Sequence, residues 1–191
     1  MTQQSNNLHS DTTQVILVDG SDNTIGLAEK NSAHADGLLH RAFSIFIFND
    51  KGEMLIQQRA DEKYHSGGLW ANSCCGHPEE NELTKNAAER RLQQELGFSV
   101  TLTWHNAFIY RQKVSEQMAE HEYVHLYSGV FNQNPDFNEN EVQGIKWIQW
   151  SKLQQLMIQY EELFSAWFVH YLKQHKEKIQ QIVNNYRIGS L

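Results

Sequence analysis

Two adjacent cysteines, Cys74 and Cys75, lie in the stretch NSCCGHP (72–78), and the chain has no others. Neighbouring cysteines bond to each other only with strain, because a disulfide requires a particular separation of its Cα atoms. A structural zinc site usually takes four Cys/His ligands in paired spacings, which two adjacent cysteines do not supply. A thiol that performs chemistry and a buried inert thiol remain as alternatives. In an extended segment Cys75 shares a face with His77, and this alternation favours Cys75 as the reactive thiol and Cys74 as part of the core.

The helix that follows this stretch has a spacing associated with phosphate chemistry. From Gly76 the sequence runs through five residues to Glu82, then through seven residues to RRLQQELGF (90–98). This pattern resembles the Nudix box, Gx5Ex7REUxEExGU with U apolar, over 23 positions. In a working Nudix hydrolase, carboxylates on one face of this helix converge on Mg²⁺. Arg91 and Gln94 stand where two of those carboxylates belong, which argues against hydrolysis.

Further segments resemble a more specific family, the type I isopentenyl diphosphate isomerases. These enzymes have a Nudix fold and interconvert isopentenyl and dimethylallyl diphosphate. The matching segments follow the family order and are EKNSAH (29–34), LLHRAFSIFIFN (38–49), WANSCCGHP (70–78), RRLQQELG (90–97), YRQ (110–112), EHE (120–122) and FSAWF (164–168). The degraded Nudix helix is itself a feature of that family. The resemblance therefore implies an isomerase.

The resemblance also implies a divalent metal held by three histidines and two glutamates, namely His34, His40, His77, Glu120 and Glu122. Imidazoles and carboxylates together suit Mn²⁺, Zn²⁺ or Mg²⁺. Alternation in an extended segment puts the two glutamates on one face. Five protein ligands leave little room for an activated water, which disfavours hydrolysis by a metal-bound hydroxide.

Moving a double bond by one position requires an acid and a base, one on each face of the alkene. The resemblance makes Cys75 the thiolate base and Glu122 the acid, oriented by Tyr110, with the roles of acid and base exchanged in the reverse direction. It places Trp167 beside the carbocation-like centre, where the face of an indole ring stabilises positive charge. Such a pocket must exclude water, because water would convert the cation into an alcohol.

The diphosphate of such a substrate needs positive groups. The resemblance implies Lys30, Arg59, Lys63 and Arg91 for this purpose, with a second Mg²⁺ carried by Glu95. Arginine makes forked contacts with phosphate and lysine acts as a point charge. The remaining histidines have no such support and are expected to be structural: His9, His65, His105, His121, His125, His170 and His175.

One mixed α/β (α+β) domain, with its sheet between helices, is expected to position these residues. Strands are predicted at 15–19, at 100–112, at 123–131, at 145–150, and as a hairpin within 43–59 that turns at Asp50-Lys51-Gly52. Helices are predicted at 82–97, closed by Gly97, then at 151–160 and at about 161–186. Loops are predicted at 60–70 and 132–144. Residues 1–13 are predicted to be a disordered tail, and 14–191 a single Nudix-type domain.

The composition limits the possible partners of this 191-residue chain. Its formal charge is −7 without a basic block, so nucleic acid is not an expected partner, although a local positive pocket for an anionic small molecule is compatible with this charge. No apolar run is long enough to span a bilayer, and the polar start does not resemble a secretory signal. We therefore expect a cytoplasmic protein, a monomer or weak homodimer, that binds an isoprenoid diphosphate.

Three other functions compete with the isomerase. A Nudix hydrolase of nucleoside diphosphate derivatives would need carboxylates at positions 91 and 94. A catalytically dead binding module would bind an isoprenoid diphosphate without turnover, and the intact set Cys75, Tyr110, Glu120 and Glu122 argues against it. A cysteine hydrolase would need an oriented Cys-His-Asn/Asp arrangement, which cannot be picked out here.

Overall fold

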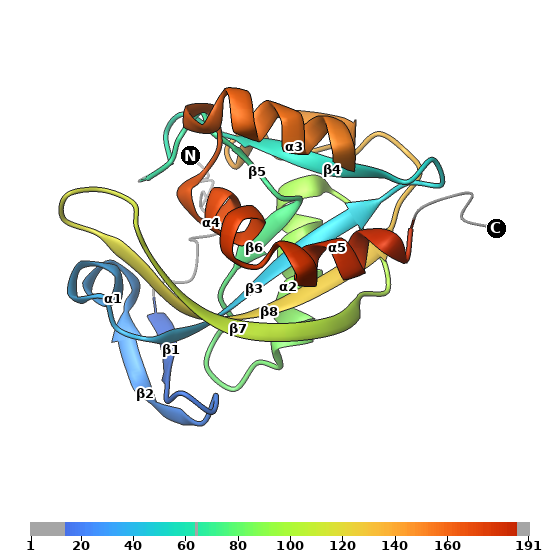
Figure 1. Cartoon of the computed structure of the whole chain (residues 1–191). Helices are drawn as coiled ribbons and strands as arrows, with labels where there is room; N and C mark the ends of the chain where they lie inside the picture. Colours follow the sequence, from blue (N-terminus) through green and yellow to red (C-terminus); the bar gives the residue numbers. More distant parts are fainter. Residues whose placement is uncertain (1–13, 64, 187–191) are drawn as a thin grey trace, which may run out of the picture.

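The computed structural model describes residues 14–63 and 65–186, which form a mixed sheet with helices on both of its faces (Figure 1). The strands are β1 (Gln14–Val18), β2 (Thr24–Glu29), β3 (His40–Phe48), β4 (Glu53–Arg59), β5 (Trp70–Ala71), β6 (Cys74–Gly76), β7 (Thr103–Lys113), β8 (Ala119–Val130) and β9 (Val142–Gln149). The helices are α1 (Lys30–Asp36), α2 (Thr84–Leu96), α3 (Trp150–Gln159), the 3₁₀ turn η1 (Glu161–Leu163), α4 (Ala166–Gln174) and α5 (Lys176–Asn184). The predicted fold class, an α+β Nudix fold with its sheet between helices, is therefore confirmed.

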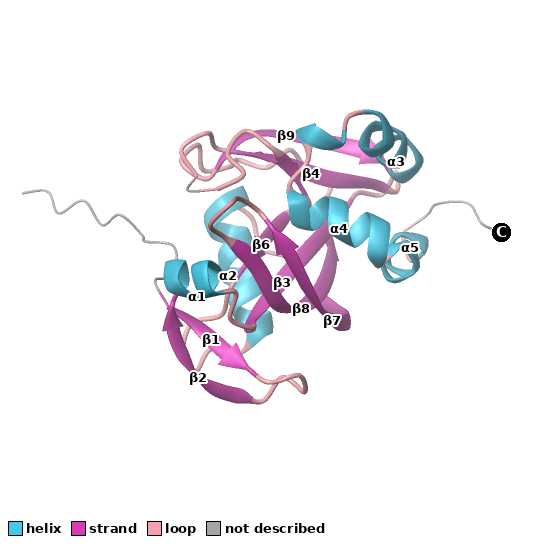
Figure 2. Ribbon diagram, turned by 60° about the vertical axis from the view of Figure 1, so that its left-hand side comes forward, coloured by secondary structure: helices cyan, strands magenta, loops and turns pink. Residues whose placement is uncertain are grey.

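Strand β3 runs through the centre of the sheet and is covered on both faces, which explains its nearly continuous apolar sequence. On one face Phe46 joins a core cluster with Phe168 of α4 and Ile179 of α5. On the opposite face Ile45 joins a second cluster with Leu92 of α2. Each such side chain contributes about 1.5–3 kcal/mol by its burial. Figure 2 shows α2 and the α4–α5 pair on opposite sides of β3 and β8.

Several predicted elements are confirmed within a few residues of their expected bounds, namely β1, β3, β4, β7, β8, β9, α2 and α3. Helix α2 ends as predicted, because Gly97 adopts the left-handed conformation (φ 74°) and its backbone N–H bonds to the Gln93 carbonyl. A Cβ at this position would lie 2.2 Å from the carbonyl oxygen of Asp136, so only glycine fits here.

The predicted hairpin within 43–59 is correct in its turn, but its two strands separate. They pair only where Phe48 faces Met54. Beyond that point β3 pairs with β6 and with β8, while β4 pairs with β5 and β9. The strands diverge because each finds long-range partners that a local hairpin does not include.

The single helix predicted at about 161–186 is wrong, because the structure breaks this segment at two places. Phe164 is extended and bridges to Trp70, and the backbone N–H of Ser165 donates to the Trp70 carbonyl at 2.8 Å. Pairing with β5 thus draws these two residues out of a helix. The second break is at His175, between α4 and α5. The first break sets the start of α4 beside β5, which places Trp167 next to the cysteine stretch.

Four short elements were not predicted, namely β2, α1, β5 and β6. The predicted tail at 1–13 lies outside the described residues. Across 14–63 and 65–186, no helix has the length and apolar character needed to cross a bilayer.

Candidate active site

Strand pairing brings together the side chains that could take part in a reaction, from strands β3, β6, β7 and β8. In the parallel pair of β3 and β8, His40 lies opposite Glu122. In the antiparallel pair of β7 and β8, Tyr110 lies opposite the same Glu122. On the other edge of β3, Ser44 lies opposite Cys75 of β6. A histidine, a tyrosine and a carboxyl group therefore form one row across three strands, beside the thiol.

Two helices add residues at four-residue spacing, which stacks side chains on one helix face. On α1, Lys30 and His34 are both buried. On α2, Arg91 and Glu95 are both buried, and they bond to each other at 2.6 Å between Arg91 Nη2 and Glu95 Oε1. The position where the Nudix box loses a carboxylate thus holds a guanidinium aimed at the surviving glutamate.

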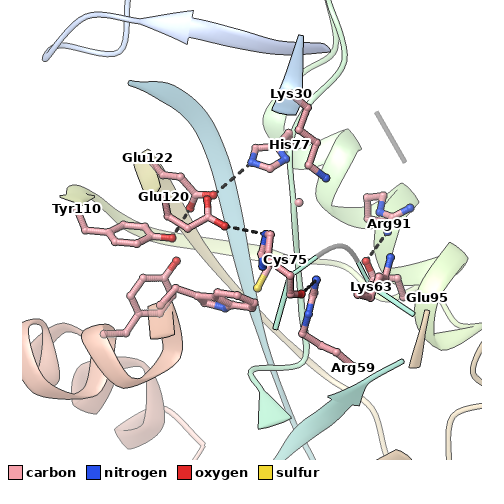
Figure 3. A pocket seen from close by; sticks show the side chains of 14 residues that line it. Lys30, Arg59, Lys63, Cys75, His77, Arg91, Glu95, Tyr110, Glu120 and Glu122 are labelled. Atoms are coloured by element: carbon pink, nitrogen blue, oxygen red, sulfur yellow. Dashed lines mark hydrogen bonds and ion pairs between the residues drawn. The ribbon is translucent and has the colours of Figure 1, made fainter. Parts of the chain in front are cut away.

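These elements enclose one pocket with about 500 Å³ of empty space, counting its open mouth. All the predicted site residues line it except His34 and His40, which are almost fully buried. In Figure 3, Glu120, Glu122 and Tyr110 lie on one side of the pocket, while Arg91 and its neighbours lie on the other. A buried acidic side therefore faces a cationic side across the thiol of Cys75.

Four of the predicted metal ligands gather tightly. One ligand atom from each of His34, His40, His77 and Glu122 lies within 4.8 Å of the others. His40 Nδ1 is 2.8 Å from the Leu38 carbonyl, to which it donates, so its Nε2 offers a lone pair to the cluster. That Nε2 is buried and makes no hydrogen bond among the described residues. A buried imidazole lone pair of this kind fits a metal ion.

The electrostatics of the imidazoles agree with this fit. Burial lowers the pKa of His40 to about 4. Burial and the nearby His40 also hold the pKa of His77 well below its usual value. Both rings are therefore neutral at pH 7, which is the state that binds a divalent metal. Three imidazoles and a carboxylate make a donor set suited to Mn²⁺ or Zn²⁺.

The two glutamates of β8 differ in ionisation. Burial opposes ionisation of Glu120, but hydrogen bonds from His34 and His65 outweigh it and hold its pKa well below the usual value. Burial and the neighbouring Glu120 charge raise the pKa of Glu122 well above its usual value. Two carboxyl groups in contact separate in this way because both cannot ionise easily. Of the two carboxyl groups, Glu122 is therefore the one that keeps its proton to the higher pH.

The thiol of Cys75 is held by a small set of polar partners. Its Sγ donates to Asn72 Oδ1 at 3.1 Å, and the Ser44 hydroxyl donates to Sγ at 3.6 Å. Trp167 Nε1 donates to the same Asn72 oxygen at 3.3 Å. Behind Ser44, the Tyr171 hydroxyl lies 3.1 Å away. Burial nevertheless raises the pKa of the Cys75 thiol to about 12.

Cys74 faces the opposite side of the sheet, as the alternation predicts. Its side chain is fully buried in the core cluster that contains Leu92, and burial raises the pKa of its thiol well above the usual value. A thiol in this position is inert packing.

The cations predicted for the diphosphate are present on the opposite side of the pocket. Arg91 Nη2 lies 3.3 Å from Glu141 Oε2, and the Lys63 ammonium forms an ion pair with the same carboxylate. Gln57 Nε2 donates to Glu95 Oε2 at 3.0 Å. Glu141 therefore orders two of the four predicted cations, Arg91 and Lys63.

The comparisons with known proteins agree with this arrangement. Residues 38–168 match the NUDIX domain. An isopentenyl-diphosphate delta-isomerase of Serratia proteamaculans is 46% identical over 83% of this chain and 89% of its own length. A second such protein, from Photorhabdus laumondii, is 46% identical over 81% of this chain and 87% of its own length. The chain belongs to the isopentenyl-diphosphate delta-isomerases of the NUDIX family.

Solved structures support the fold alone. DR0079 from Deinococcus radiodurans has a TM-score of 0.70 at 16% identity and covers 84% of this chain and 98% of its own. The Nudix hydrolase RenU from M. smegmatis has a TM-score of 0.53 at 17% identity, covering 74% of this chain and 86% of its own. The sheet with its flanking helices is therefore shared with hydrolases of the same fold, whereas the sequence similarity lies with the isomerases.

The site also contains residues that were not predicted to take part, among them His65, Asn72 and Glu141. His65 was expected to be structural, yet it lines the pocket and lies 3.2 Å from Glu120. Asn72 connects Cys75 with Trp167, and its position inside NSCCGHP was the available signal. Glu141 lies in the segment 132–144, which the sequence predicts only to be a loop. Nothing in this local sequence connects it with Lys63 or Arg91.

Proposed function

We propose that the enzyme interconverts isopentenyl and dimethylallyl diphosphate through Glu122 and Cys75. The observation that carries this proposal is their common pocket, in which a buried carboxyl group with a raised pKa and a thiol line the same space as four cationic side chains. An acid and a base near one short hydrocarbon are what a double-bond shift requires. The cations suit the diphosphate at the other end of the substrate.

In the forward reaction the Glu122 O–H transfers its proton to C4 of isopentenyl diphosphate. The π electrons between C3 and C4 form the new C4–H bond, and positive charge develops at C3. In the complex the four cations of the pocket are proposed to favour the thiolate of Cys75, which burial disfavours in the free protein. The Cys75 thiolate takes a proton from C2, and the C2–H electron pair becomes the C2=C3 double bond. Glu122 ends as a carboxylate and Cys75 as a thiol, which are the states that the reverse reaction uses.

Two aromatic side chains support these steps. Tyr110 donates a 2.7 Å hydrogen bond to Glu122 Oε2 and so fixes the carboxyl group that transfers the proton. Trp167 is buried beside the thiol and offers its ring to the developing positive charge. The guanidinium of Arg59 lies 5.1 Å from the centre of this ring, and this contact between a cation and the indole supports the proposed role.

A divalent metal (Mn²⁺, Zn²⁺ or Mg²⁺) would be held by His34, His40, His77, Glu120 and Glu122. When bound, such an ion supplies positive charge that fixes the carboxyl groups and disfavours alternative protonation of the histidines. We assign a second Mg²⁺, entering with the diphosphate, to Glu95. Lys30, Arg59, Lys63 and Arg91 are proposed to bind the diphosphate oxygens.

The location, oligomeric state and partners of the enzyme are part of the same proposal. We expect the enzyme to work in the cytoplasm as a monomer or weak homodimer, without nucleic acid. The net charge of −7 and the absence of a basic block support the last point. Light scattering during gel filtration would measure the oligomeric state directly.

Incubation with isopentenyl diphosphate and Mg²⁺ in deuterated water tests the function. We expect deuterium in the dimethylallyl diphosphate formed, because Glu122 exchanges its proton with solvent between turnovers. The Cys75→Ala variant is the control and is expected to show no exchange into product. Release of phosphate or pyrophosphate would instead indicate a Nudix hydrolase, and binding without turnover would indicate a dead module.

A further inference from the structure

His65 occupies a position in the pocket that the family resemblance does not explain. It lies in the connection from β4 to β5, and its side chain is 8% exposed. Its ring lines the same pocket as Cys75 and Glu122. The connection also carries Lys63 and follows directly on Arg59, so it belongs to the cationic side of the pocket while His65 reaches across to the acidic side.

Two hydrogen bonds define how the His65 ring is held. Ser66 Oγ lies 3.3 Å from His65 Nδ1, and Glu120 Oε1 lies 3.2 Å from His65 Nε2. A carboxylate accepts and does not donate, so Nε2 carries the proton and Nδ1 accepts from the serine hydroxyl. The other oxygen of Glu120, Oε2, lies 3.2 Å from His34 Nε2. A histidine nitrogen thus lies 3.2 Å from each oxygen of Glu120, and one of these two histidines is His65.

The His65 ring also contacts the indole ring of Trp167. The rings of His65 and Trp167 form a T-shaped contact, with ring centroids 5.7 Å apart and an angle of 83° between the ring planes. Arg59 connects to both residues, because its Nη2 donates to the His65 carbonyl at 3.3 Å while its guanidinium lies over Trp167. The side chain of His65 therefore contacts the Glu120 carboxylate and the indole ring of Trp167. Its backbone carbonyl accepts the hydrogen bond from Arg59.

The local backbone is built to hold this side chain in place. Ser66 adopts a left-handed conformation with φ 53°, and Gly68 has φ 75°. A Cβ at Gly67 would lie 2.3 Å from the carbonyl oxygen of Asp61, so the turn closes on itself too tightly for any other residue. This tightly closed turn follows directly on His65 and restricts the backbone beside it.

We propose that His65 is a positioning residue of the isomerisation site. Its Nε2–H fixes Glu120 Oε1, so that Oε2 faces the histidine cluster, and its ring contact fixes the plane of Trp167. The inference rests on the proposed function for its catalytic meaning, but the hold on Glu120 is a property of the protein alone. Partners of metal-ligating side chains orient those ligands, and their removal typically costs 10- to 100-fold in metal affinity or activity.

Release of metal in the absence of substrate tests this proposal. The protein is loaded with Co²⁺, and the loss of its visible absorption is followed after addition of excess chelator. We expect His65→Ala to release Co²⁺ about 10- to 100-fold faster than the unchanged protein. His65→Gln, which keeps an N–H at a similar reach, is expected to recover a large part of this difference. Glu62→Gln, an exposed change in the same connection, serves as the matched control and should release Co²⁺ at the unchanged rate.

The steady-state kinetics and the folding of the same variants complete the test. In His65→Ala we expect kcat to fall more than KM rises, because Glu120 and Trp167 act on the reacting end of the substrate. Unchanged Co²⁺ release in His65→Ala, or equal losses in His65→Ala and His65→Gln, would overturn the hold on Glu120. Faster Co²⁺ release in a protein that does not isomerise would keep this inference and refute the proposed function instead. Melting curves in EDTA separate a general loss of folding from the specific loss of metal.

Discussion

Tyr110 and Glu122 lie opposite each other on adjacent strands, and the tyrosine hydroxyl donates to Glu122 Oε2 at 2.7 Å. The second oxygen, Oε1, lies 3.2 Å from His77 Nε2. The carboxyl group therefore presents one oxygen to the histidine cluster and the other to a hydroxyl group. The hydrogen bond from Tyr110 acts to lower the pKa of Glu122, so it stabilises the carboxylate that would remain after the proposed proton transfer.

Removal of this hydroxyl tests its part in catalysis. In Tyr110→Phe the Glu122 carboxyl keeps its cluster contacts but loses its buried donor. Proton transfer leaves Glu122 as a carboxylate, and a hydrogen bond to a charged group contributes about 1.5–3 kcal/mol, so we expect kcat to fall roughly 10- to 100-fold with metal content retained. Tyr160→Phe, at an exposed tyrosine outside the pocket, is the control. A kcat for Tyr110→Phe equal to that of the control would contradict the assignment.

The two cysteines offer a paired test of the base. We expect Cys75→Ala to lower interconversion by about 10²–10⁴-fold, the usual contribution of an acid or base catalyst. Cys74→Ala removes a buried core side chain, so its effect should appear in the melting temperature with turnover nearly unchanged. Rates and metal content are measured for both variants. Equal losses of turnover, or normal turnover in Cys75→Ala, would show that the base is another group.

The raised pKa of the Cys75 thiol predicts a pH dependence. Burial raises it to about 12 from an ordinary value near 9. In Cys74→Ala protein without metal or substrate, alkylation by iodoacetamide should therefore accelerate about tenfold per pH unit from pH 7 to beyond pH 10. Because the folded pKa exceeds the unfolded one, the associated stability is complete below about pH 8.5 and is lost as the pH rises toward 12. A plateau of the alkylation rate near pH 9 would mean that the thiol is not desolvated.

Local periodicity accounts for the parts of the site that a single sequence predicts. Cys75 shares a face with His77 because residues two apart in a strand do so, and Cys74 enters the core for the same reason. Arg91 and Glu95 meet because residues four apart on a helix are neighbours. These relationships depend on a few adjacent residues, so they follow from the local strand or helix alone.

Long-range pairing accounts for what the sequence leaves open. The parallel register of β3 and β8 sets His40 beside Glu122, and 81 positions of chain separate them. The backbone bridge between Trp70 and Phe164 breaks a segment that reads locally as one helix. The contact of His65 with Glu120 is also long-range, because it requires the connection between β4 and β5 to meet strand β8. Resemblance to a family supplies ligands at such distances, but it does not supply a contact outside the family pattern.

Addition of metal to the metal-free protein should raise its stability. Binding to the folded state at a hundred times Kd contributes about 2.7 kcal/mol, and we expect a clear rise in melting temperature with Mn²⁺ or Zn²⁺. His40→Gln removes one imidazole of the cluster with little change in volume and should abolish most of this rise. His170→Gln, on α4 and outside the cluster, should keep it. An equal rise in all three proteins would place the ion elsewhere.

Arg91 and its neighbour Arg90 provide a matched test of diphosphate binding. Arg91 is buried against Glu95 in the pocket, whereas Arg90 Nε donates to Glu82 at 2.8 Å outside it. Loss of charge-assisted bonds to phosphate costs about 1.5–3 kcal/mol, so Arg91→Ala should raise KM roughly 10- to 100-fold. Arg90→Ala should leave KM unchanged and lower only the melting temperature. Arg91→Lys should recover part of the affinity, because lysine restores the charge without the fork. If both alanine variants changed KM alike, a general loss of positive charge would explain the result. The proposed binding of the diphosphate by Arg91 would then be refuted.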